Sequence, residues 1–167
     1  MTSVFRSALV AAVALAVFVP AADAAQYGAG LHYQRTIDDF DVDELDQNDF
    51  TIFGSVTVPV ALVKVEGDLE ITPDYLGSDN VLFQPAAYGL LDLGLAYGGI
   101  GIGIGYLDGD WASSPFYSLR GGIELGLGGF AVDGFLEYRF QDASFGDAID
   151  DLNLDALRLG AQVKFGG

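Results

Sequence analysis

From residue 26 onward, the sequence alternates between apolar side chains and polar or glycine residues with a period of two. In residues 130–141, Phe, Val, Gly, Leu, Tyr and Phe occupy the even positions, and Ala, Asp, Phe, Glu, Arg and Gln the odd ones. Successive side chains of a β-strand point to opposite faces, whereas a helix repeats every 3.6 residues. The alternation therefore predicts an all-β chain whose strands each have one apolar and one polar face.

Eight such segments are separated by turn signals, at about 26–36, 50–58, 61–72, 81–97, 100–107, 116–127, 130–141 and 156–165. Long connections at 37–49, 73–80, 108–115 and 142–155 alternate with tight turns at Pro59-Val60, Gly98-Gly99 and Gly128-Gly129. This pattern predicts an up-and-down antiparallel meander with both termini at the tight-turn end. The segment 81–97 fits least well, because residues 81–91 are apolar on both parities and Pro85 cannot donate a ladder hydrogen bond. We expect this strand to begin later or to carry a bulge near Pro85.

The charges are sorted between connections and strand faces. The chain has a formal charge of −17, yet 51% of it is hydrophobic and its mean hydropathy is +0.35. Of the 23 acidic residues after residue 24, sixteen fall in the long connections and seven on the polar parity of the strands. Five of the six basic residues share that parity, and Arg35, near a strand end, is the exception. We expect a lumenal charge network of Lys64, Glu66, Asp68, Glu70, Arg120, Glu124, Asp133, Glu137, Arg139, Arg158 and Lys164.

One apolar face per strand fits either a soluble barrel or a barrel in lipid. The polar parity is rich in glycine and in opposite charges, which suits a crowded lumen, and the apolar parity carries large side chains. Aromatic residues gather near the strand ends, among them Tyr97, as in membrane interfaces. Spanning strands must close, because every backbone group in lipid needs a partner. We therefore expect a membrane-spanning up-and-down antiparallel β-barrel of eight strands, with long acidic external loops and tight periplasmic turns; the alternative is a soluble barrel.

The first 24 residues have the pattern of a secretory signal peptide. Arg6 is followed by an apolar run at 8–19, then Pro20 and the small-x-small triplet Ala22-Asp23-Ala24. The run is 12 residues long, too short for a hydrocarbon layer of roughly 30 Å. We expect a signal peptide at 1–24 and a barrel domain at 25–167, with a retained N-terminal anchor as the alternative.

The signal peptide, the eight alternating segments and the acidic connections together resemble the small outer-membrane barrels of the OmpA/OmpX type. The last segment carries Arg158-x-Gly160-x-x-Val163-x-Phe165, which is similar to the C-terminal strand pattern that the barrel-assembly machinery recognises. In that family the aromatic residue is usually last, whereas here Gly166-Gly167 follow. The resemblance implies a monomer in the cell outer membrane, inserted by that machinery and in contact with lipid and lipopolysaccharide.

Composition excludes several kinds of chemistry. The chain has no cysteine, so it has no disulfides, thiolate metal sites or cysteine nucleophile. Its negative charge argues against nucleic acid, which is bound by Lys and Arg. An eight-stranded barrel is just wide enough for its own side chains. We expect a lumen plugged by ion pairs, such as Arg120 or Arg139 with Glu124, Asp133 or Glu137; the alternative is a narrow porin-like channel for ions or small solutes.

Enzymatic and metal sites are poorly supported. His32 is the single histidine. The outer-membrane lipid A deacylases of this architecture place a serine two residues after their histidine, where this chain has Gln34. We expect no catalytic residue, cofactor or metal site, and a lipid-modifying enzyme built around His32 is the least favoured alternative.

The acidic segment at 38–46 resembles the start of an EF-hand loop. Asp39, Asp41 and Asp43 have the expected spacing, but Glu44 and Phe50 stand where glycine and glutamate are needed. The cluster predicts at most weak binding of divalent cations. The favoured function is a structural outer-membrane barrel that supports envelope integrity or surface interaction through its acidic loops.

Overall fold

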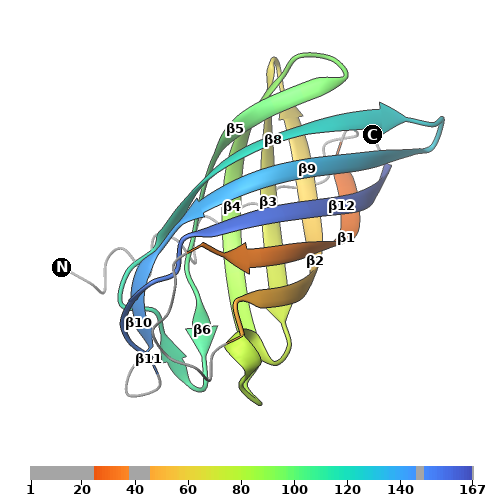
Figure 1. Cartoon of the computed structure of the whole chain (residues 1–167). Helices are drawn as coiled ribbons and strands as arrows, with labels where there is room; N and C mark the ends of the chain where they lie inside the picture. Colours follow the sequence, from red (N-terminus) through yellow and green to blue (C-terminus); the bar gives the residue numbers. More distant parts are fainter. Residues whose placement is uncertain (1–24, 38–45, 146–148, 167) are drawn as a thin grey trace.

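The computed structural model describes residues 25–37, 46–145 and 149–166, and it forms a closed antiparallel β-barrel (Figure 1). Neighbouring strands in the sequence pair with one another, and β1 pairs with β12 to close the barrel. The expected all-β, eight-stranded architecture is therefore confirmed. Among the described residues, no helix is long and apolar enough to cross a membrane. The barrel strands are β1 (Gln26–Thr36), β2 (Asn48–Val60), β3 (Val63–Thr72), β4 (Leu82–Asp92), β5 (Ala96–Gly103), β8 (Phe116–Gly126), β9 (Phe130–Phe140) and β12 (Ala156–Gly166).

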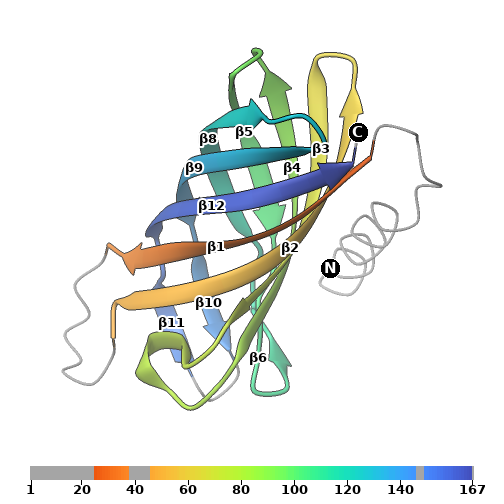
Figure 2. The same cartoon turned by 90° about the vertical axis from the view of Figure 1, so that its right-hand side faces the viewer.

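The two ends of the barrel differ in their connections. Three tight turns, at 61–62, 93–95 and 127–129, lie at the same end as residues 25 and 166. The other end carries the longer connections, which contain short elements of their own (Figures 1 and 2). These are the 3₁₀ turn η1 (Tyr75–Gly77) and two hairpins, β6 (Tyr106–Leu107) with β7 (Asp110–Trp111) and β10 (Asp142–Phe145) with β11 (Ile149–Asn153). Long and tight connections alternate as expected.

The expected turn at Gly98-Gly99 is wrong. The turn between β4 and β5 lies at 93–95, and both glycines are inside β5. A Cβ atom on Gly99 would collide with the Gly89 backbone, and one on Gly101 with the Tyr88 ring. Gly99 and Gly101 are therefore needed because a neighbouring backbone and an aromatic ring come close to them, and not because the chain turns there. With the turn moved, Tyr97 belongs to β5 and points into the lumen instead of lying in an aromatic girdle, and it is 5% exposed.

The other turn boundaries shift less. The first tight turn is Ala61-Leu62 rather than Pro59-Val60, because β2 extends to Val60. The Gly128-Gly129 turn is confirmed. Both of its glycines have positive φ, 77° and 106°, a conformation that L side chains rarely adopt.

Pro85 lies within β4, so the expected late start or bulge of this strand is wrong. The pairing of β3 with β4 runs without a shift from Val63 opposite Leu91 to Thr72 opposite Leu82. The Pro85 carbonyl accepts a hydrogen bond of 3.2 Å from the Ile104 amide on the other side of β4. Because N–H and C=O of one residue point to the same side of an antiparallel strand, the donor that proline lacks would also face Ile104. The ladder is interrupted there, between β5 and β6, and not in β4.

Burial in the barrel is inverted relative to a water-soluble protein. Large apolar side chains point outward at mid-strand, for example Ile100 at 67% and Leu159 at 64% exposure, while Arg139 and Glu66 are fully buried inside. Soluble monomers rarely expose a contiguous apolar surface of this kind, and lipid-facing barrels require one. We call the outward residues Leu31, Ile52, Leu69, Ile100, Leu119, Ile123, Leu136 and Leu159 the apolar band.

Candidate functional site in the barrel lumen

Strand parity places the charged residues inside the barrel. In β3 every second side chain points inward, so that Lys64, Glu66, Asp68 and Glu70 form one row along the lumen. Strands β8, β9 and β12 face this row and contribute most of the cations. The residues expected in the lumen from these strands are Arg120, Glu124, Asp133, Glu137, Arg139, Arg158 and Lys164, and all but Glu124 are buried.

Arg120 lies at the centre of the lumen. Its guanidinium is 2.8 Å from Glu137, 2.9 Å from Glu66 and 3.2 Å from Asp68, which places carboxylates of β3 and β9 around one cation. The guanidinium carbon also lies 3.6 Å from the centre of the Tyr88 ring and 4.4 Å from that of Phe135. A planar guanidinium can donate in several directions while its faces stack on aromatic rings. Arg120 thereby ties opposite walls of the barrel together.

A second group of charges lies toward the long loops. Glu70 accepts from Arg139 at 2.9 Å and from Arg158 at 2.7 Å. Gln84 of β4 accepts from the same two guanidinium groups, at 3.0 and 3.2 Å. Glu137 lies 3.2 Å from Arg139 and joins this group to Arg120. Each buried cation therefore has a carboxylate partner, as charges in a low-dielectric interior require.

A third group of charges lies toward the tight turns. Lys164 contacts Glu66 at 2.8 Å, Glu124 at 3.1 Å and Asp133 at 3.3 Å. Lys64 contacts Glu124 at 2.8 Å and Asp92 at 3.1 Å. Through the shared partners Glu66, Glu124 and Glu137, all three groups form one continuous network from end to end.

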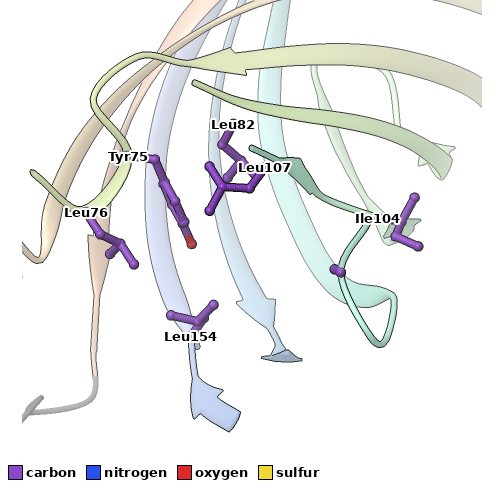
Figure 3. Close-up of a cluster of buried hydrophobic side chains, with 7 residues drawn as sticks. Tyr75, Leu76, Leu82, Ile104, Leu107 and Leu154 are labelled. Carbon is purple, nitrogen blue, oxygen red and sulfur yellow. The ribbon is translucent and has the colours of Figure 1, made fainter. Parts of the chain in front are cut away.

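The long-loop end of the lumen is covered by an apolar cluster, which we call the cap. Figure 3 shows the side chains of Tyr75, Leu82 and Leu107 close to one another in this cluster. Burial raises the pKa of the Tyr75 phenol well above its usual range, so the hydroxyl stays protonated. Asp49 fixes η1 to β2 by accepting a 3.1 Å hydrogen bond from the Leu76 amide. The cap consists of Tyr75, Leu76, Leu82, Ile104, Leu107, Ala112 and Leu154.

Some of these contacts follow from the sequence and others do not. The pairing of Arg120 with Glu137 on the neighbouring strand is among those expected. Glu124 instead pairs with both Lys64 and Lys164, and Asp133 pairs with Lys164. The ion pairs that join β3 to β8, β9 and β12 do not follow from the sequence pattern. Asp92 has the inward parity in the sequence, which was the one available signal for its pairing with Lys64.

His32 is fully enclosed by the network and by two aromatic rings. Its Nε2 atom lies 3.5 Å from Arg158 and 3.8 Å from Glu70, and its ring packs against Phe53 and Phe135. These contacts of His32 are those of a packed lumenal side chain, and no group of three or more metal-ligating residues occurs in the described ranges.

The C-terminal strand pattern of Arg158, Gly160, Val163 and Phe165 lies on β12, and its residues occupy both faces of the strand. Arg158 and Gly160 are buried inside, and Phe165 is exposed outside. A Cβ atom on Gly160 would collide with the Phe135 ring, so the glycine also has a packing role. Residues 1–24, including the expected signal peptide, and Asp39, Asp41 and Asp43 lie outside the described residues.

Comparison with solved structures identifies the architecture. The crystal structure of Neisserial surface protein A (NspA) superimposes with a TM-score of 0.64 at 14% identity, over 86% of this chain and 96% of that chain. The chain has the fold of an outer-membrane β-barrel. The outer membrane protein Ail of Yersinia pestis, in a phospholipid bilayer nanodisc, matches at a TM-score of 0.47 and 15% identity, over 84% of this chain and 99% of that chain. No protein-family model and no curated protein sequence matches the chain.

Proposed function

We propose that the protein is an integral outer-membrane β-barrel with a closed lumen, which stabilises the envelope and presents its acidic long-loop end at the surface. The observation that carries this proposal is the inverted burial: the apolar band faces outward, while a continuous charge network fills the interior. Such a surface is favourable in a hydrocarbon layer and unfavourable in water. The fold shared with NspA supports the same environment.

Two features at different depths of the barrel support a closed lumen. Arg120 and its carboxylate partners cross the barrel at its centre, and the cap covers the long-loop end. Opening a path would require breaking buried ion pairs and exposing Leu76 and Leu82, which are at most 1% exposed. These features favour a structural barrel over the narrow channel.

Fractionation and gel mobility test the barrel proposal. We expect the protein in the outer-membrane fraction, with unboiled and boiled samples running at different mobilities, because a closed barrel resists detergent until it is heated. Recovery as a soluble periplasmic protein, or one mobility in both samples, would overturn the proposal.

Planar-bilayer recording tests the closed lumen. We expect no stable conductance steps from the purified barrel. A variant that lacks the central crossing, Arg120→Ala, serves as the matched control, because leak that appears only in this variant would place the barrier at Arg120. Stable steps in the unmodified protein would favour the channel.

The remaining parts of the proposal concern partners. We propose insertion by the barrel-assembly machinery through Arg158, Gly160, Val163 and Phe165, a monomeric state in contact with lipid and lipopolysaccharide, and no catalytic role for His32. The residue-specific test is Phe165→Ala beside the control Phe140→Ala, another exposed aromatic at a strand end. Reduced assembly of the first variant alone is expected. Equal assembly of both variants would show that Phe165 is not needed for recognition by the barrel-assembly machinery.

A further inference from the structure

The tight-turn end of the barrel is built of exposed apolar residues. Leu62 is 71% exposed, Leu93 68%, Leu95 67% and Leu127 58%, and these four residues come from all three turns. We call them the turn leucines. Turns that stand in water are normally rich in Gly, Pro, Asn, Asp and Ser, so this composition calls for an explanation.

Charge is excluded from the outside of this end. The nearby Lys64 and Glu124 point into the lumen and pair with each other, and Asp92, at the rim with a side chain 32% exposed, pairs with the same lysine. There is no Asp, Glu, Lys or Arg in the described outer segments of this end, at 25–26, 59–63, 93–96, 125–131 and 165–166. The opposite end carries the acidic connections. The tight-turn end is therefore suited to an apolar surrounding, and the long-loop end is suited to water.

Part of the turn backbone is paired within the protein. The Leu93 amide donates to the Ala96 carbonyl at 2.9 Å, and the Leu127 amide donates to the Phe130 carbonyl at 2.8 Å. The Gly94 amide donates to the Asp92 carboxylate at 2.9 Å.

Turn carbonyls find partners on neighbouring strands. The carbonyl of Leu62 accepts a hydrogen bond from the Asp92 backbone amide, and that of Leu95 from the Glu124 backbone amide, both at 2.9 Å. These bonds lower the cost of placing the turns at a membrane surface, where unpaired backbone groups are unfavourable.

The apolar surface continues from the band to the turns without a polar break. Near this end, Tyr27, Phe165 and Phe130 lie opposite one another on β1, β12 and β9 and are all exposed. Aromatic side chains favour the headgroup level of a bilayer. Phe130 directly follows the Gly128-Gly129 turn, so this level coincides with the turns themselves.

We propose that the turn leucines are a lipid-contacting surface, placed at the boundary between headgroups and acyl chains of the leaflet that they face. This inference rests on the proposed membrane function and adds the position of the barrel in the bilayer. A lipid leaflet fits as the occupant because it can cover all three turns around the rim at once. The ion pair of Lys64 with Asp92 then lies at the membrane surface.

Tryptophan reporters in vesicles with brominated acyl chains test the inference. In a Trp111→Phe background, Leu95→Trp and Leu62→Trp report on two different turns. Leu159→Trp reports on the apolar band, and Trp111 of the unmodified protein reports on the long-loop end. We expect bromolipid quenching at both turns within about twofold of the band reporter, and weak quenching by aqueous iodide.

The outcomes separate this inference from the proposed function. If Leu159→Trp is quenched by bromolipid while both turn reporters are quenched by iodide, the turns stand in water and the inference fails alone. If the turn reporters are shielded from both quenchers, protein covers them, and the lipid assignment is likewise overturned. If Leu159→Trp itself is not quenched by bromolipid, the membrane barrel fails as well.

Discussion

Replacement of Arg120 by methionine removes the central buried charge while keeping most of its volume. Arg120 is 3% exposed and contacts three carboxylates. Without it, Glu66 keeps Lys164 at 2.8 Å and Glu137 keeps Arg139 at 3.2 Å. The one ion pair of Asp68 among the described residues is with Arg120, so this buried carboxylate loses its cation and must either stay charged in the interior or take up a proton. We expect Arg120→Met to lower the free energy of unfolding by about 3–5 kcal/mol, the range for breaking a buried ion pair.

A second substitution identifies the source of that loss. Adding Asp68→Asn to Arg120→Met removes the carboxylate that has lost its partner, and the remaining loss should fall to about 1–2 kcal/mol. The control is Arg35→Met, an exposed arginine on the outer face, which should change stability by less than about 0.5 kcal/mol.

Urea unfolding in lipid vesicles, followed by the fluorescence of Trp111 and by gel mobility, measures these differences. The reasoning is refuted if Arg120→Met unfolds within about 1 kcal/mol of the unmodified protein, or if Asp68→Asn deepens the loss instead of relieving it.

Three further substitutions test other parts of the structure. Gly101→Val should abolish the heat-modifiable gel band, because its Cβ meets the Tyr88 ring, whereas Gly89→Val points into open space and should retain the band; folding of both variants would contradict the packing argument. Leu76→Ala should destabilise the cap by about 2–4 kcal/mol, seen as faster hydrogen exchange in η1, and unchanged exchange would show that the cap does not depend on this side chain. Ala61→Gly should stabilise the barrel by about 1 kcal/mol, since Ala61 has a φ of 57° and left-handed backbone is costly for alanine; an unchanged urea midpoint would contradict this.

The fold was predictable because its main determinant is local. Parity within β3 places Glu66, Asp68 and Glu70 on one face, whatever the partners of that strand. The alternation of long and tight connections then gives the order of the strands. Neither inference needs information from distant parts of the chain.

The errors arose where one residue type serves two purposes. Glycine marks turns, but in β5 it leaves room for the Gly89 backbone and the Tyr88 ring. Reading Gly98-Gly99 as a turn also assigned Tyr97 to the wrong strand and face. Proline at position 85 indicated a disrupted strand, yet its missing donor faces a gap in the neighbouring ladder.

The pairing inside the lumen could not be predicted from parity. Glu70 meets Arg139 and Arg158 across the barrel, and such contacts depend on how far the strands are staggered when the sheet closes. The cap likewise joins Tyr75, Leu107 and Leu154 from three connections, and no local pattern connects them.

The central claim, that the apolar parity faces lipid and the charged parity faces the lumen, can be measured directly along one strand. The chain has no cysteine, so single cysteines at consecutive positions 157–163 of β12 can each carry a nitroxide label in the vesicle-embedded protein. The account predicts oxygen accessibility that alternates with a period of two, high at Leu157, Leu159 and Ala161 and low between them. Alternation in the opposite phase, or high accessibility of the leucine positions to a water-soluble relaxation reagent, would contradict it.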